Sequence, residues 1–282
     1  RAVRRPRAPN NVRLSSFRFA PAASMSEQYP EVFMVGDNRE VVLAAVRQNG
    51  RLFQWLSATP RADREVVLAA VRQNGRLLQW ASATLKADRE VVLAAVQHDD
   101  YGVALGYASD ALKADRGVVL AAVRRRGRAL GSASEALKAD REVVLAAVWQ
   151  QYCALQYASA ALKADREVVL VAMRQQPCAL EWASATLKAD REVVLAAVRQ
   201  NGRALEYASA ALQADREVVL VAMRKRWGWS ALEWASAALQ ADRGVVLAAV
   251  RKDGRALEYA SEALRADHGV VLAAVRKDGR AL

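Results

Sequence analysis

The residues of this chain that could do chemistry are few, and most of them are cationic. Of its two histidines, His268 follows a predicted capping aspartate, whereas His98 is followed by two acidic residues, Asp99 and Asp100. The three could touch a metal ion, but adjacent residues lack the spacing of a metal-ligand set and are typical of a solvated turn. The sequence has no glycine-rich phosphate loop and no spacing that suggests a Ser, His and Asp triad. It therefore predicts no catalytic residue, no metal and no cofactor, and so neither an enzyme nor a small-molecule substrate.

The remaining candidates suit binding, because they are arginine clusters with aromatic residues close by. Such a strip can hold RNA phosphates and stack a base. An acidic protein surface or lipid headgroups would fit the same charges, and cations at the C-terminal end of a helix also offset its dipole. The residues predicted to bind a partner are His98, Tyr101, Arg124, Arg125, Arg126, Arg128, Arg224, Lys225, Arg226, Trp227 and Trp229.

The first 37 residues form a second basic feature. Residues 1–30 contain six arginines, four prolines and a single acidic residue, Glu27. This composition is typical of an organellar transit peptide, so the segment is either the remnant of a targeting sequence or a mature basic extension. Its small apolar surface cannot offset the entropy of ordering, which favours an arm lying on a partner over one folded back on its own chain. The predicted contacts of the arm are Arg4, Arg5, Arg7, Arg13 and Arg18.

The elements that must position these residues are tandem repeats. The segment from Asp190 to Leu212, D-R-E-V-V-L-A-A-V-R-Q-N-G-R-A-L-E-Y-A-S-A-A-L, recurs in steps of 25 residues, twice lengthened to 27. A fixed period of this size indicates a repeat architecture. We predict an extended basic arm over residues 1–37 and an all-α solenoid of about ten helical hairpins over residues 38–282. The repeats start at residues 38, 63, 88, 115, 140, 165, 190, 215, 242 and 267.

Each repeat is predicted to be a hairpin of two α-helices of about three turns. Asp190 is a good N-cap residue. The apolar residues from 193 to 198 sweep an arc of about 200°, so the first helix should be packed on both flanks. Gly202 is expected to end that helix in the left-handed conformation. A second helix is predicted from about Arg203 to Leu212.

The links between the two helices should line one edge of the solenoid, where their basic residues add into a ridge. Two-residue insertions lengthen the links at residues 97–103 and 224–230, and such insertions often mark a binding face. The opposite edge, with the sequence L-K-A-D-R-E, is close to neutral. Cys153 and Cys178 occupy the same repeat position one unit apart, beyond the reach of a disulfide, and should remain free thiols.

An aromatic residue recurs once per repeat in the second helix, with Ser132 as the one gap. We expect these rings to pack between repeats with their polar ends exposed to solvent, in preference to forming a platform on which a pigment, base or peptide stacks. The ladder comprises Trp55, Trp80, Tyr107, Tyr157, Trp182, Tyr207, Trp234 and Tyr259.

The motif D-R-E-V-V-L-A-A-V followed by A-L-x-[YW]-A-S-x-x-L-K-A-D resembles the tandem repeats named domain of unknown function four-one-one-six. That family is abundant in unicellular algae and other protists. The resemblance covers residues 38–282 and implies an α-helical repeat without an assigned activity. It therefore carries no catalytic or binding residue over to this chain.

We expect a non-catalytic scaffold or accessory subunit of a larger assembly, with protein subunits as its partners. The composition of the arm points to a plastid or mitochondrion, and the resemblance suggests a photosynthetic complex or an organellar ribosome as the setting. With no apolar run long enough to span a bilayer, we expect membrane contact to be peripheral. The alternatives are direct RNA binding by the basic edge and peptide binding on the concave face.

Overall fold

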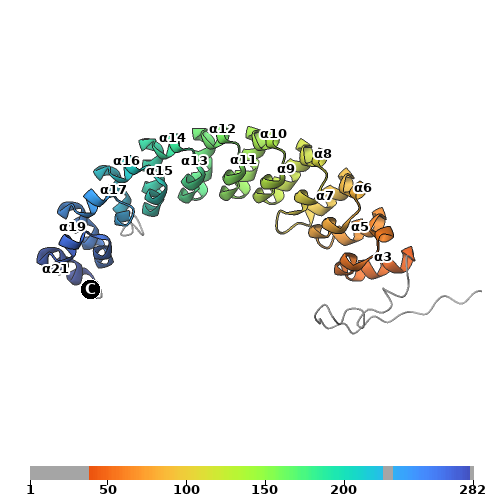
Figure 1. Cartoon of the computed structure of the whole chain (residues 1–282), viewed down its shortest axis with the longest axis horizontal. Helices are drawn as coiled ribbons and strands as arrows, with labels where there is room; N and C mark the ends of the chain where they lie inside the picture. The colour runs from red at the N-terminus through yellow and green to blue at the C-terminus, as the bar shows by residue number, and fades with distance from the viewer. Residues whose placement is uncertain (1–37, 225–230, 280–282) are drawn as a thin grey trace, which may run out of the picture.

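The repeats stack side by side into an arch, as Figure 1 shows. The computed structural model describes residues 38–224 and 231–279. Over those ranges every repeat is helical and no strand is present. The predicted all-α solenoid is therefore confirmed. The predicted arm, residues 1–37, lies outside the described residues.

One long α-helix opens each repeat, and an aspartate or asparagine caps its first turn. The Asp190 carboxylate accepts hydrogen bonds from the amides of Glu192 and Val193, as predicted. The long helices are α3 (Arg39–Gln48), α5 (Arg64–Val71), α7 (Arg89–Gln97), α9 (Arg116–Arg125), α11 (Arg141–Gln150), α13 (Arg166–Gln175), α15 (Arg191–Gln200), α17 (Arg216–Met223), α19 (Arg243–Lys252) and α21 (His268–Lys277).

The second half of the repeat is not the continuous helix that the sequence predicted. It is a 3₁₀-helix followed by a single turn of α-helix. The 3₁₀-helices are η2 (Gly50–Trp55), η3 (Gly75–Trp80), η4 (Ala104–Tyr107), η5 (Gly127–Ser132), η6 (Tyr152–Tyr157), η7 (Pro177–Trp182), η8 (Gly202–Tyr207) and η10 (Gly254–Tyr259). The short α-helices are α4 (Ala58–Arg61), α6 (Ala83–Lys86), α8 (Asp110–Lys113), α10 (Glu135–Lys138), α12 (Ala160–Lys163), α14 (Ala185–Lys188), α16 (Ala210–Gln213), α18 (Ala237–Gln240) and α20 (Glu262–Arg265).

The break falls at the alanine–serine pair of the repeat. Ala183 has φ −67° and ψ 157°, an extended conformation that no helix continues through. Ser184 then caps α14 by accepting a hydrogen bond from the amide of Leu187. The serine is therefore an N-cap residue, which is the position that serine favours, and not a small residue inside a helix.

The glycine of the link has a different role from the predicted left-handed terminator. The long helix α15 ends at Asn201 in an extended conformation, and Gly202 begins η8. Among the described glycines, only Gly102 has a positive φ, of 71°. What these positions require is space: a Cβ on Gly127 would lie 2.3 Å from the carbonyl oxygen of Ala147 in the next repeat. The glycine thus permits close approach of two backbones.

Within the described ranges, two repeats carry a side chain at that glycine position. Tyr152 and Pro177 occupy it in η6 and η7. The helix α13, which follows Tyr152 and precedes Pro177, packs less closely against α11 and α15 than α9 packs against α11. A side chain at the start of the 3₁₀-helix thus coincides with looser packing of these long helices.

The core runs as one continuous layer along the arch. In α15, Val193, Val194, Ala197 and Val198 are fully buried, so the long helix is packed on both flanks as predicted. Leu205 from η8 is also fully buried, and Leu212 from α16 is 8% exposed. Full burial of a valine or leucine side chain contributes about 1.5–3 kcal/mol. Stacking therefore stabilises helices that would be marginal alone.

Candidate partner-binding edge

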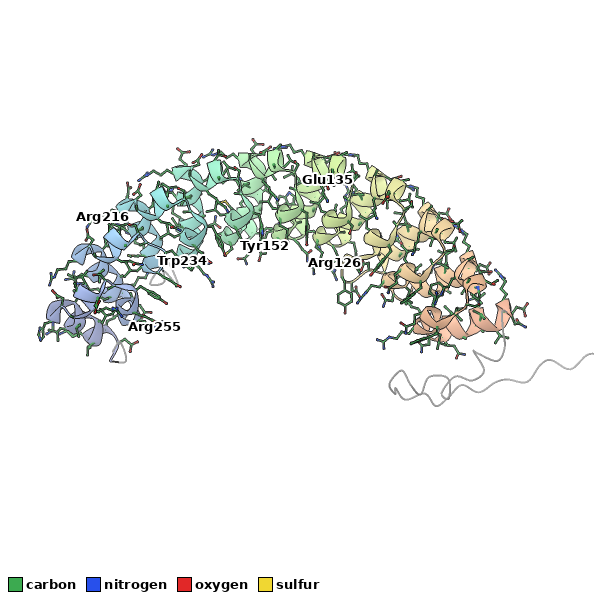
Figure 2. The ribbon with its side chains drawn as sticks, viewed as in Figure 1. Arg126, Glu135, Tyr152, Arg216, Trp234 and Arg255 are labelled. Atoms are coloured by element: carbon green, nitrogen blue, oxygen red, sulfur yellow. The ribbon has the colours of Figure 1, made fainter. Side chains whose placement is uncertain are left out.

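The arch has an outer, convex edge and an inner, concave edge, and each long helix runs from the first to the second. Arg216, the first residue of α17, lies on the outer edge, whereas Arg126, which follows α9, lies on the inner edge (Figure 2). The short α-helices lie on the outer edge (Figure 1). The links between long helices and 3₁₀-helices therefore line the inner edge, as the sequence predicted for one common edge.

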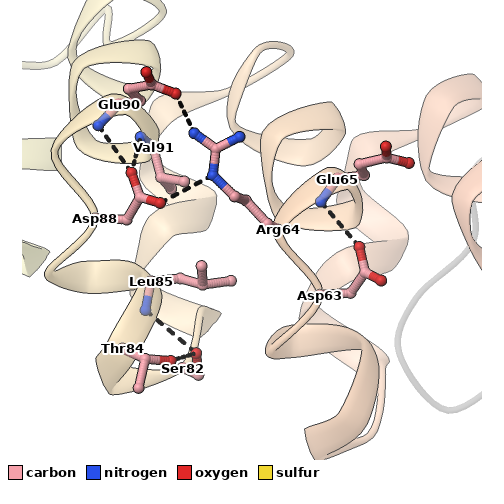
Figure 3. Close-up of polar contacts among 9 residues, drawn as sticks. All are labelled: Asp63, Arg64, Glu65, Ser82, Thr84, Leu85, Asp88, Glu90 and Val91. Atoms are coloured by element: carbon pink, nitrogen blue, oxygen red, sulfur yellow. Dashed lines mark hydrogen bonds and ion pairs between the residues drawn. The ribbon is translucent and has the colours of Figure 1, made fainter.

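The outer edge holds a ladder of ion pairs that joins each repeat to the next. In Figure 3, Arg64 donates from Nε to Asp88 Oδ2 at 2.9 Å and from Nη2 to Glu90. Partial burial would raise the pKa of Asp88, but hydrogen bonds from Arg64 and the amides of Val91 and Glu90 outweigh it and lower that pKa. The arginines that make the equivalent contact are Arg39, Arg64, Arg89, Arg116, Arg141, Arg166, Arg191, Arg216 and Arg243.

The ladder loses one of its two acceptors where glycine replaces the glutamate. Arg89 pairs with Asp115 alone, because Gly117 stands at the glutamate position. A Cβ on Gly117 would lie 2.9 Å from Arg89 Nη2, so the guanidinium occupies the space that a side chain would fill. Gly244 and Gly269 repeat this arrangement in later repeats.

A second ladder on the outer edge is made by the backbone. The amide of Ser159 donates to the carbonyl of Lys138, the last residue of the preceding short helix, at 2.9 Å. The same bond recurs from Ser82, Ser109, Ser134, Ser184, Ser209, Ser236 and Ser261. Each of these junctions thus has this main-chain hydrogen bond in addition to its ion pairs.

The insertion in the repeat that starts at Asp88 forms a loop on the inner edge that is held by hydrogen bonds. Asp99 is only 3% exposed, and its carboxylate accepts from the amides of Tyr101, at 3.0 Å, and Ala104, at 2.6 Å. A Cβ on Gly102 would lie 2.8 Å from Arg128 Cγ, so the loop touches the next repeat. The predicted contact Tyr101 is 60% exposed, with the guanidinium of Arg76 5.4 Å from its ring centre.

His98 does not join a group of possible ligands. It is exposed at the end of α7, and its Nδ1 lies 3.0 Å from the carbonyl oxygen of Ala94. Within residues 38–224 and 231–279, no three His, Cys, Asp or Glu side chains are grouped as a metal would require. The acidic side chain beside it, Asp99, is occupied by backbone amides.

The predicted cluster Arg124–Arg128 divides into neutralised and exposed members. Arg125 Nη2 pairs with Asp100 at 3.1 Å, and Arg126 Nε donates to the carbonyl of Asp100 at 2.8 Å. The amide of Arg128 donates to Gln151 Oε1 at 3.0 Å. Arg124, at the same repeat position as Arg199, is exposed and has no ion pair among the described residues. The insertion loop therefore neutralises part of the predicted ridge.

Arg124 belongs to a regular row, which we call the inner arginine row. Its members occupy the position that follows the last valine or methionine of the long-helix motif. They are exposed, and none of them forms an ion pair with another residue in the described ranges. The row comprises Arg47, Arg72, Arg124, Arg174, Arg199, Arg224, Arg251 and Arg276. Of these, the sequence-based site contained Arg124 and Arg224.

Six of the eight rings of the aromatic ladder pack against the core, as predicted, whereas Trp55 and Trp80 are exposed. A Cβ on Gly131 would lie 3.0 Å from ring carbons of Tyr157, so this ring covers the backbone of the preceding repeat. Trp182 and Trp234 are likewise partly buried against the core. Trp80 is more open, at 37% exposed, with the Arg61 guanidinium 5.4 Å from its ring centre.

The most exposed of the large apolar side chains was missed by the predicted site. Trp149 is 65% exposed and takes the place of an arginine in the inner arginine row. Three residues later in the sequence, Tyr152 pairs with Trp182, with ring centres 5.8 Å apart and the planes tilted by 40°. The signal was present in the sequence as the only tryptophan at a position that is otherwise arginine or glutamine.

The remaining sequence predictions have separate outcomes. Cys153 and Cys178 are free thiols, as predicted, and burial raises the pKa of Cys178. The arm residues Arg4, Arg5, Arg7, Arg13 and Arg18, and the link residues Lys225, Arg226, Trp227 and Trp229, lie outside the described residues. In the described part of the chain, no helix has the length and apolar character needed to cross a membrane.

Comparison with known proteins identifies the repeat and leaves its activity open. The family model described as Domain of unknown function (DUF4116) matches residues 63–113, 88–138, 115–160, 140–188, 190–240 and 242–282. No curated protein and no solved structure gives a significant match. The matches run through nearly all of the solenoid, and the first four of them overlap. The chain belongs to the family of tandem helical repeats that contain the Domain of unknown function (DUF4116).

Proposed function

We propose that this protein is a non-catalytic scaffold, an accessory subunit that binds an anionic partner along its inner edge within a larger assembly. The arginine-rich arm is proposed as a second contact. Its composition suggests an organelle, either a plastid or a mitochondrion, and a photosynthetic complex or an organellar ribosome is the proposed setting.

The observation that supports this proposal is the division of the arginines between the two edges. Outer-edge arginines such as Arg64 and Arg141 are matched by carboxylates of the next repeat. Inner-row arginines such as Arg174 and Arg199 are exposed and have no ion-pair partner among the described residues. A row of like charges on one edge creates a potential that attracts and orients an anionic partner.

The test is native co-fractionation from the source cells followed by cross-linking of the intact complex. We expect the protein to migrate well above its 30.8 kDa mass, with cross-links concentrated on the inner edge, around Arg126 and Arg255. Residues on the outer edge, such as Glu135, serve as the internal control. Migration as a free monomer would exclude a stable subunit, and cross-links on the outer edge would exclude the inner edge as the binding surface.

A further inference from the structure

The inner arginine row has the regularity of a surface for a linear polyanion. From Arg174 onward, five successive repeats place an arginine at the same position: Arg174, Arg199, Arg224, Arg251 and Arg276. Neighbouring stacked helices lie about 8–10 Å apart, so the cations recur at short steps along the edge. A folded protein presents carboxylates at irregular intervals, whereas a polynucleotide carries one negative charge on every residue. A cation at the same position of successive repeats therefore favours a polynucleotide.

The row is interrupted near its middle by an aromatic side chain. Trp149 stands in the row between Arg124 and Arg174, one repeat from each, and is 65% exposed. Its backbone is fixed, because Gln175 Nε2 of the next repeat donates to the carbonyls of Val148 and Trp149, both at 2.9 Å. The exposed ring is thus held on a rigid helix end and not on a loose loop.

We infer that the inner arginine row and Trp149 together bind single-stranded RNA, with phosphates against the arginines and one base stacked on the indole ring. Exposed rings stack on unpaired bases, which a duplex does not offer. RNA recognition by proteins is directed mostly at single-stranded segments whose bases are free to stack. This inference rests on the proposed function, because it names the partner of the same inner edge.

The arrangement predicts binding with little sequence preference. Arginines that contact phosphates supply affinity and register but do not read bases. A single ring accepts any base, since every base has a π-face. The binding constant should therefore depend steeply on salt and weakly on sequence.

Fluorescence anisotropy with a fluorescein-labelled polyuridine RNA of about 30 nucleotides tests the inference on the full chain. The variant R174A/R199A/R251A removes three members of the row. The matched control K86A/K163A/K188A removes three charges from the short outer-edge helices, where these lysines form no ion pair within the described ranges. Both variants have the same net charge.

We expect the arginine variant to bind more weakly and to lower the slope of log K against log salt by about 2, at roughly 0.7 for each phosphate that is no longer neutralised. The lysine control should keep the wild-type slope. Equal losses in the two variants would show nonspecific attraction by net charge and overturn the inference.

Trp149 provides an independent readout that net charge does not influence. We expect W149A to weaken RNA binding by about 5- to 150-fold, and W149F to retain part of the affinity, because a ring still stacks. Inorganic polyphosphate should bind W149A and wild type equally, since it has no bases. An unchanged RNA affinity in W149A would overturn the stacking role.

The two proposals fail separately. If wild-type protein does not bind the RNA, and the cellular complex persists after ribonuclease treatment, the RNA inference is wrong and the scaffold proposal stands with a protein partner. If the protein migrates as a monomer with and without ribonuclease, the scaffold proposal fails whatever the RNA result.

Discussion

Replacing Gly127 with alanine should loosen one junction of the arch. In the native structure a Cβ at this position would lie 2.3 Å from the carbonyl oxygen of Ala147 and 3.1 Å from the amide nitrogen of Gln151. Both atoms belong to the backbone of the next repeat, so a side-chain rotation cannot relieve the overlap. The long helices α9 and α11 must move apart instead.

The magnitude follows from the distance that has to open. Relieving the overlap requires a shift of about 1 Å, and a gap of that size forfeits a quarter to a half of the attraction between packed atoms. Val123 and Val148, which are fully buried in these two helices, would lose part of their packing. Overpacking of this kind costs about 1–3 kcal/mol. The backbone of Gly127 does not have a positive φ, so strain adds nothing further.

The assay is hydrogen–deuterium exchange of peptides from α9 and α11, because a repeat array can open at a single junction. A loss of about 1–3 kcal/mol corresponds to about 5- to 150-fold faster exchange through that opening. The matched control is G50A at the same repeat position, where the three atoms nearest to a Cβ all belong to the side chain of Gln73, at 3.0–3.2 Å. If G127A exchanges no faster than G50A, the proposed role of the glycine in helix spacing is wrong.

Three further outcomes can be checked. S134A should destabilise its junction by about 0.5–1 kcal/mol, since the Ser134 hydroxyl caps a short helix. S209A should be nearly neutral, because that buried hydroxyl has no hydrogen-bond partner among the described residues. Urea unfolding of the two variants measures this difference in stability, and equal losses would contradict it. Burial raises the pKa of Asp140, but hydrogen bonds from Arg116 and two backbone amides outweigh it and lower that pKa below the usual value. The stabilising effect of Asp140 is therefore complete at neutral pH and is lost as pH falls through the lowered pKa. D140N should therefore weaken the loss of helical circular dichroism signal on acidification. An unchanged acid transition would show that the ionised Asp140 carboxylate does not stabilise the junction. W149A should leave the thermal midpoint within about 2 °C of wild type, since substitution of an exposed side chain costs under about 0.5 kcal/mol.

The repeat period, the start of each long helix and the apolar flanks could all be predicted from the sequence. These features are local. An aspartate before a run such as V-V-L-A-A-V caps a helix by bonding to its own first amides, as Asp190 does. The apolar arc follows from the helical period alone. The same locality makes the family motif recognisable in the linear order of residues.

The second half of the repeat was mispredicted because its local sequence favours a helix that contacts with another repeat interrupt. The run A-L-E-Y-A-S contains no proline or glycine, and its residues are compatible with a continuous helix. What breaks the helix is an interaction with another repeat: the amide of Ser159 is taken by the carbonyl of Lys138, 21 residues earlier. A partner at that distance leaves no mark on local propensity.

The candidate site, like the fold, could be predicted only in part from the sequence. The linear order of residues is enough to show that the links share one edge and carry its arginines, because a fixed period repeats every position in space. Which of these arginines are neutralised depends on the packing of one repeat on the next. Arg64 reaches Asp88 and Glu90, and Arg125 reaches Asp100, in each case across the junction between two repeats. Arg124, next to Arg125 in sequence, has no such carboxylate within reach among the described residues. Charge composition is a property of the chain, but charge pairing depends on distances between repeats, which stacking alone fixes.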